Sequence, residues 1–295
     1  MSKAVPVKDN AKRDTRFSIA QATYEIVNNP YLPTPCKVME FFRESGDNFT
    51  ITIESSMDPQ PGQFVQVSLP GIGECPISIA SHNQEHIKLN IRQVGNMTNA
   101  LAKLRTGDTL FIRGPYGNSY PMEQLVGNNL VFIGGGCGVA PLKGIVDYVE
   151  NHREAYKDIH LIFGFRSPDD ILFRRESTLW RKQYHMVVSV DKDPHQGDNT
   201  SCYTGPVGFV TEVLKTQRIA PTNTVVFVCG PPIMMKFVIQ ILKDKGFHDD
   251  QIFISAERLM YCAIGKCCHC MIRGKFTCMD GPVFRYDQVA NDTND

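Results

Sequence analysis

Four cysteines near the end of the chain constrain its fold more than any other feature. Cys262, Cys267, Cys270 and Cys278 read C-x4-C-x2-C-x7-C. The first three have the spacing of the loop that winds around a plant-type two-iron, two-sulfur ([2Fe–2S]) cluster, and the fourth ligand comes from elsewhere in such chains. Cys278 follows a short predicted hairpin at 271–276. The segment therefore predicts a [2Fe–2S] centre with these four cysteines as ligands.

Three other interpretations of the cysteines compete with a cluster. Structural zinc prefers two close cysteine pairs, and here only Cys267 and Cys270 form a C-x2-C pair. Disulfides need an oxidising compartment, and the first residues lack the apolar core of a signal peptide. Inert buried thiols do not explain five cysteines in one glycine-containing turn. The fifth, Cys268, would give a C-x5-C-x-C spacing that no known cluster loop uses, so we expect that it is not a ligand.

Length and charge exclude several classes of protein. The chain has 295 residues, enough for two domains and an appendage, and 42% of them are hydrophobic. Lysine plus arginine and aspartate plus glutamate each number 31, so no basic field is present for a nucleic-acid backbone. No apolar run approaches the ~18 residues of a membrane-spanning helix. We expect a cytoplasmic protein that binds no nucleic acid and has no membrane span.

The first half of the chain predicts an all-β domain. Short runs of alternating apolar and polar residues are separated by clusters of proline, glycine and aspartate, which is typical of a small antiparallel barrel. We place this barrel at residues 31–121, after a flexible polar tail at residues 1–30. The expected strands are 48–54, 63–69, 76–81, 86–92 and 109–113, with one helix at 98–104.

The second half predicts an α/β domain at residues 122–256. Wholly apolar strands alternate with helical patterns, which indicates a parallel sheet covered on both faces. Ligands of such sheets bind at the carboxyl ends of the strands. The expected strands are 130–133, 159–164, 186–190, 225–229 and 252–255, and the clearest helices are 140–149 and 233–245.

Several strand ends have the composition of ligand-binding loops. Residues 92–98 combine an arginine, a glycine and a threonine at a predicted helix start, which suits a pyrophosphate. A tight turn begins at Gly114. The glycines of 134–138 open a helix after an apolar strand, and a C-G-P-P sequence at 229–232 follows another. Each segment alone is equally compatible with an ordinary turn, and their value lies in combination.

Together these segments resemble the ferredoxin–NADP reductase superfamily. The motifs are P-I-S-I at 76–79, I-R-x-x-G-x-x-T at 91–98, G-P-Y-G-N at 114–118, G-G-G-x-G-x-A-P at 134–141 and C-G-P-P-x-M at 229–234. The chain departs from the R-x-Y-S pattern of many members, because it has P-I-S without that arginine. The resemblance implies FAD on the barrel, with Pro76, Ile77 and Ser78 beside the isoalloxazine, Arg92, Gly95 and Thr98 near the phosphates, and Gly114 nearby.

The same resemblance implies a pyridine nucleotide on the α/β domain. It places the pyrophosphate on Gly135, Gly136 and Gly138, the nicotinamide near Cys229, Gly230 and Pro231, and the adenosine ribose near Arg166. The charges after the third strand bear on NADH versus NADPH. Asp191 would repel a 2′-phosphate and accept ribose hydroxyl groups, whereas Lys192 and Arg166 favour a phosphate. We expect NADH, with NADPH as the alternative.

The C-terminal signature narrows the resemblance. E-R-x-M-x-C-x-x-G-x-C-x-x-C followed by C-x-D-G-P-V-F resembles the electron-transfer subunit of dihydroorotate dehydrogenase. More closely it resembles the gamma subunit of cytoplasmic nickel–iron (sulf)hydrogenases and the electron-transfer subunit of anaerobic sulfite reductase. The resemblance implies a [2Fe–2S] subdomain at 257–295 and electron transfer between NAD(P)H, FAD, the cluster and a partner.

The expected partners are the catalytic and iron–sulfur subunits of a larger redox complex. A dihydroorotate dehydrogenase-type or disulfide reductase-type complex is the alternative, and a zinc-bearing binding scaffold is the non-enzyme alternative. FAD links a two-electron hydride donor to a one-electron cluster, so this chemistry needs no acid–base pair. We therefore name no catalytic side chain.

Overall fold

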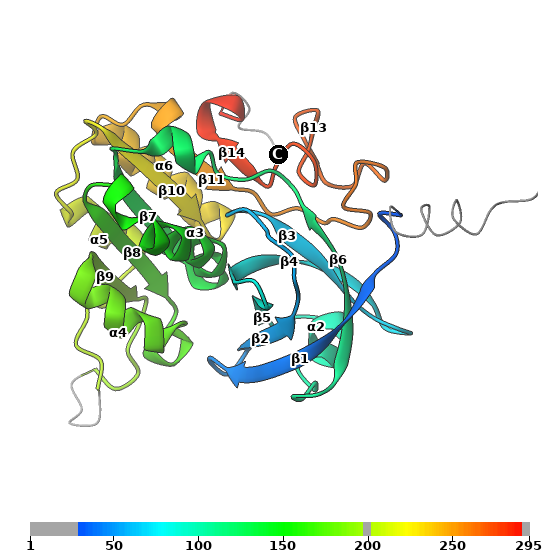
Figure 1. The fold of residues 1–295 in the computed structure, drawn as a ribbon. Helices are drawn as coiled ribbons and strands as arrows, with labels where there is room; N and C mark the ends of the chain where they lie inside the picture. Colours follow the sequence, from blue (N-terminus) through cyan, green and yellow to red (C-terminus); the bar gives the residue numbers. More distant parts are fainter. Residues whose placement is uncertain (1–28, 197–201, 291–295) are drawn as a thin grey trace, which may run out of the picture. The chain divides into compact units, whose positions relative to one another are not determined.

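The computed structural model describes residues 29–196 and 202–290 (Figure 1). Almost all of the tail predicted at 1–30 lies outside these residues. The architecture described below belongs to the compact unit from Pro33 to Asp295. Within the described ranges, no helix is both long enough and apolar enough to cross a membrane.

Six antiparallel strands close into a barrel in the order β1-β2-β5-β4-β3-β6. Alternate residues point inward, so Val65 and Val67 of β3 are fully buried with Ile87 and Leu89 of β5. The predicted antiparallel barrel is confirmed. The strands are β1 (Thr34–Arg43), β2 (Asn48–Glu54), β3 (Phe64–Leu69), β4 (Gly73–His82), β5 (His86–Arg92) and β6 (Thr109–Tyr116).

Three details of the barrel differ from the sequence prediction. Strand β1 was missing from it, because the exposed and buried positions of Thr34–Arg43 do not alternate regularly. Helix α2 spans Asn96–Leu101, so it begins and ends earlier than the predicted 98–104. Strand β6 continues through the Gly-Pro-Tyr sequence that was expected to form a turn.

The α/β domain is a sheet in the order β14-β11-β10-β7-β8-β9, in which β7 to β11 are parallel. Its strands are β7 (Asn129–Gly135), β8 (Ile159–Phe165), β9 (His185–Val190), β10 (Thr224–Cys229) and β11 (Ile252–Ser255). Its helices are α3 (Val139–Asn151), α4 (Arg174–Gln183), α5 (Val210–Thr216) and α6 (Pro232–Asp244). Short 3-10 turns are η1 (Met122–Leu125), η2 (Gly136–Gly138), η3 (Arg153–Ala155), η4 (Pro168–Asp170), η5 (Asp249–Gln251) and η6 (Tyr286–Gln288).

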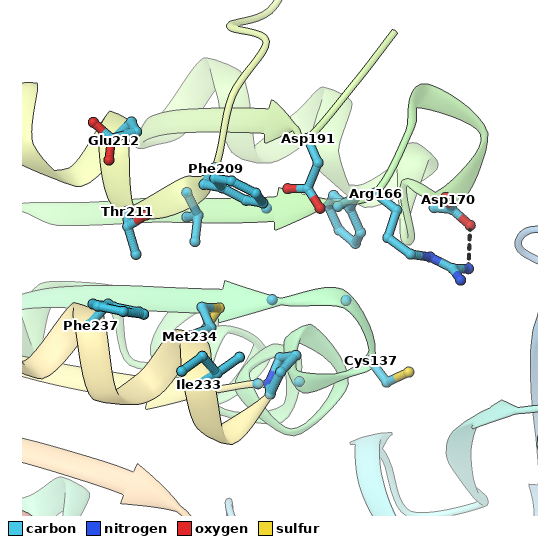
Figure 2. Close-up of a pocket in the computed structure, with 18 of the residues that line it drawn as sticks. Cys137, Arg166, Asp170, Asp191, Phe209, Thr211, Glu212, Ile233, Met234 and Phe237 are labelled. Atoms are coloured by element: carbon cyan, nitrogen blue, oxygen red, sulfur yellow. Dashed lines mark hydrogen bonds and ion pairs between the residues drawn. The ribbon is translucent and has the colours of Figure 1, made fainter. Parts of the chain in front are cut away.

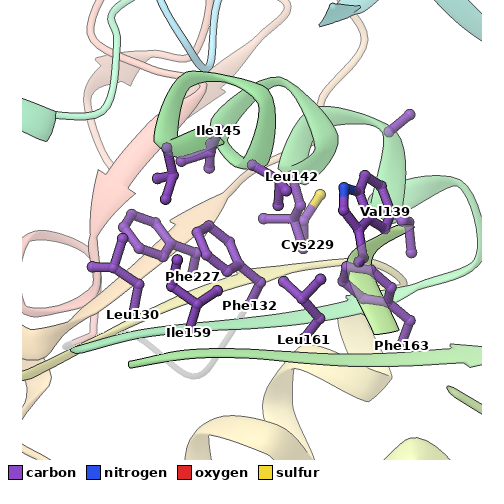
Figure 3. Close-up of a cluster of buried hydrophobic side chains, with 14 of the residues drawn as sticks. Leu130, Phe132, Val139, Leu142, Ile145, Ile159, Leu161, Phe163, Phe227 and Cys229 are labelled. Carbon is purple, nitrogen blue, oxygen red and sulfur yellow. The ribbon is translucent and has the colours of Figure 1, made fainter. Parts of the chain in front are cut away.

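Both faces of this sheet are covered, as the apolar strands predict. On one face Phe132 and Phe227 pack against Leu142 and Ile145 of α3 (Figure 3). The neighbouring residues of the same strands point to the other face and pack against α5 and α6. Period-two alternation between two apolar faces explains why these strands contain almost no polar residues.

The C-terminal segment joins the α/β sheet. Its hairpin, β12 (Met271–Ile272) and β13 (Lys275–Phe276), lies where the sequence predicted one. Strand β14 (Val283–Arg285) pairs antiparallel with β11 and buries Val283 and Phe284. The sheet is therefore mixed, with one antiparallel edge strand supplied by the cysteine-rich segment.

Candidate cofactor sites

A cavity of about 960 Å³ opens at the carboxyl ends of the parallel strands. This is the edge at which an open α/β sheet binds its ligands. The cavity is lined by eight of the residues singled out from the sequence, which come from both domains. They are Arg92, Gly135, Gly136, Gly138, Arg166, Asp191, Gly230 and Pro231.

The glycine loop fits a phosphate group by its backbone. A side chain at Gly138 would place its Cβ 2.5 Å from the carbonyl carbon and oxygen of Cys229, so only glycine lets the two segments approach this closely. Helix α3 begins at the next residue. The first N–H groups of a helix have no intrahelical acceptor and bind anions well. The loop therefore fits a pyrophosphate.

The thiol of Cys229 lies away from the cavity. Cys229 is fully buried in the core between β10 and α3 (Figure 3), and burial raises the pKa of its thiol. Its neighbours Gly230 and Pro231 line the cavity instead. If Cys229 contributes to nucleotide binding as the sequence suggests, its backbone does so.

Apolar side chains that the sequence analysis missed form the walls of the cavity. Phe209 lies before α5, and Ile233, Met234 and Phe237 belong to α6 on the opposite wall (Figure 2). Phe209 is 64% exposed and Phe237 is 54% exposed, which is unusual for phenylalanine outside a binding site. Helix α6 was predicted, but only its packing shows which face borders the cavity. Nothing in the sequence marks Phe209.

Asp47 connects Arg92 and Arg166 at this cavity. Its Oδ2 lies 3.1 Å from Nε of Arg92 on the barrel and 3.1 Å from Nη2 of Arg166 on the α/β domain. Burial opposes ionisation of Asp47, but the two guanidinium groups outweigh it and lower the pKa of the carboxyl. Arg166 also pairs with Asp170 at 2.9 Å. Sequence reasoning missed Asp47, which lies in the connection between β1 and β2.

The arginine and helix start expected for the FAD phosphates differ in availability. In the described part of the chain, Arg92 donates only its Nε–H, so both of its terminal NH2 groups remain for an anion. The hydroxyl of Thr98 accepts the N–H groups of Val94 and Gly95 at 2.9 and 3.0 Å. Thr98 therefore shapes its own loop. The donor set around Arg92 fits a pyrophosphate.

The other FAD candidates lie outside the large cavity. Pro76, Ile77 and Ser78 are half-buried on β4, where they pair with Gln66, Val65 and Phe64 of β3. A Cβ on Gly114 would lie 3.3 Å from the carbonyl oxygen of Phe64, so this glycine allows close packing of β6 on β3. The structure brings Arg92, but not these four residues or Gly95 and Thr98, to the cavity.

The four predicted cluster cysteines form two pairs of contacting thiols. Cys262 contacts Cys267, and Cys270 contacts Cys278. Among the described residues, no three potential ligands converge on one ion. A two-iron cluster does not need such convergence, because each iron takes two of the four thiolates. The pairs therefore fit a [2Fe–2S] cluster.

Backbone N–H groups surround the sulfur atoms. Cys262 Sγ accepts from Lys266 at 3.2 Å and from Cys267 at 3.3 Å, and Cys278 Sγ accepts from Gly265 at 3.2 Å. Backbone N–H donors, first that of His269, lower the pKa of Cys267 to about 7. Such donors stabilise thiolate ligands. Cys268 is exposed, and its thiol donates to the carbonyl of Lys266.

The turn at 114–118 contacts the cysteine-rich segment. The Asn118 amide donates to the carbonyls of Asp280 and Val283 at 2.8 and 2.7 Å and accepts the Val283 N–H at 3.1 Å. A Cβ on Gly117 would lie 2.6 Å from Pro282. This turn therefore docks the C-terminal segment on the barrel, a role that its sequence did not indicate.

Three family models match the chain in this order. An oxidoreductase FAD-binding domain matches residues 46–120, an oxidoreductase NAD-binding domain matches 132–240, and the iron–sulfur cluster binding domain of dihydroorotate dehydrogenase B matches 257–290. The chain is an oxidoreductase with binding domains for FAD, NAD and an iron–sulfur cluster. The predicted fold class and cofactors are confirmed.

Similar proteins narrow this class. Sulfhydrogenase 2 subunit gamma of Pyrococcus furiosus is 38% identical over 79% of this chain and 85% of its own length. A probable dihydroorotate dehydrogenase B electron transfer subunit of Methanocaldococcus jannaschii is 30% identical over 87% and 91%. The chain belongs to the family of electron-transfer subunits that contains these two proteins. It is an electron-transfer flavoprotein subunit, as the sequence predicted.

A solved structure shows the same fold. The NADH-dependent reduced ferredoxin–NADP oxidoreductase, studied for flavin-based electron bifurcation, superposes with a TM-score of 0.70. It is 24% identical and covers 86% of this chain and 91% of its own. The specific resemblance to anaerobic sulfite reductase stays a prediction.

Proposed function

We propose that this chain carries electrons between NADH and a separate catalytic subunit of a hydrogenase or sulfite reductase complex. When bound, FAD exchanges a hydride with the nicotinamide and single electrons with the cluster. The observation that carries the proposal is the packing of Cys270 and Cys278 directly against Phe64 of the barrel. The cluster loop and the flavin barrel therefore share one core, which keeps the distance between their cofactors fixed.

The residues of this chain bind and orient the cofactors. We assign the cluster ligands to Cys262, Cys267, Cys270 and Cys278, and the nucleotide pyrophosphate to the 135–138 loop. For FAD we assign Arg92 to the pyrophosphate and β4 to the isoalloxazine. The domains that we propose are a barrel at 31–121, an α/β domain at 122–256 and a cluster subdomain at 257–295.

Charges in the cavity support NADH over NADPH. Arg166, the cation nearest to the expected ribose site, is engaged by Asp47 and Asp170. Asp191 lines the same cavity and would repel a 2′-phosphate. An NADPH site instead needs an uncommitted cation at this position.

Exposed apolar side chains support a partner at the cluster segment. Leu259 is 70% exposed, Tyr261 56%, Met279 54% and Met271 44%, and all four flank the cysteine ligands in sequence. Such side chains around a redox centre suit a protein interface. All ten cysteines are free thiols, which supports a reducing compartment and our proposal of a cytoplasmic location.

The decisive experiment is a cofactor inventory of the native complex, purified anaerobically through a tag on this chain. Nickel with acid-labile sulfide would indicate a hydrogenase partner, and sirohaem would indicate a sulfite reductase partner. FMN beside FAD would support the dihydroorotate dehydrogenase-type alternative. Zinc without flavin or sulfide would contradict the proposed function and favour the scaffold.

A further inference from the structure

A charged side chain is buried between the barrel and the cluster loop. Arg113 of β6 is 6% exposed and pairs in register with Gln66 of β3, which is fully buried. Alternation along β3 sends Val65 into the barrel core and Phe64 and Gln66 outward. Gln66 donates to the carbonyls of Met260 and Tyr261 at 3.2 and 3.4 Å. This outer face of the barrel is therefore a polar seat for the cluster loop.

Arg113 uses all five of its N–H donors in this seat. Nε and Nη2 bind the two carboxylate oxygens of Glu74 at 2.7 and 2.5 Å. Nη1 donates to the carbonyl of Cys262 at 2.7 Å and to the Tyr116 hydroxyl at 3.3 Å. Nη2 also donates to the carbonyl of Tyr261 at 3.2 Å. A lysine has three donors and no planar fork, so it cannot reproduce this set.

These bonds restrain the first predicted ligand at both ends. The carbonyl of Cys262 accepts from Arg113, and its sulfur accepts from the N–H groups of Lys266 and Cys267. The next residue, Ala263, is buried in a left-handed conformation with φ 61°. Left-handed backbone is costly for alanine, so neighbouring contacts must maintain it. The Arg113 bond to the preceding carbonyl is one such contact.

We propose that Arg113, oriented by Glu74, is a positioning residue that fixes the Cys262 arm of the cluster loop on the barrel and sets the charge beside the cluster. The inference rests on the proposed assignment of Cys262 as a ligand. Adding an electron to a cluster adds negative charge, so a nearby anion opposes reduction and a nearby cation favours it. In the ion pair these two effects largely compensate.

The pair makes a signed prediction about the reduction potential. Glu74→Gln leaves the guanidinium uncompensated, so the midpoint potential of the cluster should rise. Arg113→Gln leaves the Glu74 carboxylate uncompensated, so the potential should fall. Arg113→Lys retains the charge but loses the bonds to carbonyls, so the EPR spectrum of the reduced cluster should change more than its potential does. A purely structural defect would not give shifts of opposite sign.

The experiment compares these variants with Arg285→Gln as a matched control. Arg285 also forms a two-bond ion pair, with Asp287 at 2.8 Å, but that pair is exposed on β14 and η6. Each full-length protein is purified anaerobically, and its FAD, iron and acid-labile sulfide are measured before EPR-monitored redox titration. We expect the Arg285 variant to match the parent protein in potential and spectrum.

Two kinds of failure are distinguishable. If the parent protein holds the cluster but Glu74→Gln and Arg113→Gln leave its potential unchanged, or shift it in the same direction, the inference about Arg113 is wrong. If Arg113→Gln does not fold, the near-isosteric Glu74→Gln decides alone, because a lower or unchanged potential would overturn the inference. If Cys262→Ala retains a complete cluster, the ligand assignment itself fails.

Discussion

At the scale of single residues, charge decides which nucleotide the cavity favours. Asp191 is the acidic group closest in sequence to the end of β9, where the ribose of a dinucleotide is expected. Arg166 cannot offset it fully, since its guanidinium already serves Asp47 and Asp170. A repelling carboxylate and a committed cation together explain a preference for NADH.

Replacing Asp191 with serine should therefore shift the preference toward NADPH. Removing one partly screened charge is worth about 1.4 kcal/mol, so the NADPH-to-NADH ratio of kcat/KM should rise about tenfold. Steady-state reduction of an artificial dye by the purified chain measures this ratio. Asp169→Ser is the control, because Asp169 is exposed near Arg166 but does not line the cavity. An unchanged ratio in Asp191→Ser would place the ribose elsewhere.

The cysteines give a second prediction at this scale. Alanine at Cys262, Cys267, Cys270 or Cys278 should remove most of the iron and acid-labile sulfide, because each thiolate supplies one of four ligand bonds. Cys268→Ala should retain both, since its thiol is exposed and contacts only a carbonyl in the described structure. Iron and sulfide assays on anaerobically purified protein compare the five variants. Loss of the cluster in Cys268→Ala would show that the ligand set is wrong.

At the scale of elements, the turn after β6 determines how the cluster segment docks. Gly117 has φ 80° and lies against Pro282, while Asn118 makes three hydrogen bonds to the same segment. The sequence indicated a turn here through its glycines and proline. It could not indicate the partner of the turn, which lies more than 160 residues later.

Gly117→Ala should loosen this docking, and Gly127→Ala is its matched control. Gly127 has φ 81°, nearly the same as Gly117, but a Cβ there would meet nothing within 4 Å. Both variants carry the left-handed strain of about 1–2 kcal/mol. Only Gly117→Ala adds a clash with Pro282, worth about another 1–3 kcal/mol. Denaturant unfolding measures the difference, and equal stabilities would argue against a tightly docked segment.

The elements also show what the sequence could and could not predict. The strands 48–54 and 86–92, and the parallel strands 159–165 and 252–255, follow from local alternation or apolar runs, and the structure has them within a residue or two. Strand β1 lacks such a pattern. Strand β14 is only three residues long and exists because it pairs with β11. Asp47 and Phe209 become site residues only through contacts between distant segments.

At the scale of the whole molecule, the cluster segment belongs structurally to both domains. It packs on the barrel through Phe64 and Arg113, and it extends the α/β sheet through β14. A freely tethered cluster domain would have neither contact. Electron transfer within the chain then requires no docking step, because the cluster loop is a fixed part of the fold.

A chain ending at residue 256 should therefore be unstable even where cofactor binding is not at issue. The truncation exposes β11 as a sheet edge and removes the buried Val283 and Phe284, whose burial is worth about 3–6 kcal/mol together. That loss is a large part of the roughly 5–15 kcal/mol that stabilises a typical domain. We expect aggregation or a strongly lowered unfolding midpoint.

The full-length chain with alanine at all four ligand cysteines separates the two causes of instability. It lacks the cluster but keeps β14 and the bonds from Asn118, so it isolates the contribution of the polypeptide. Thermal unfolding and sedimentation of both proteins, each loaded with FAD, make the comparison. If the truncated chain were monomeric and as stable as the four-alanine variant, the cluster segment would be a separable module. If only the truncated chain fails, β14 and its neighbours are part of the structure that forms the NAD site.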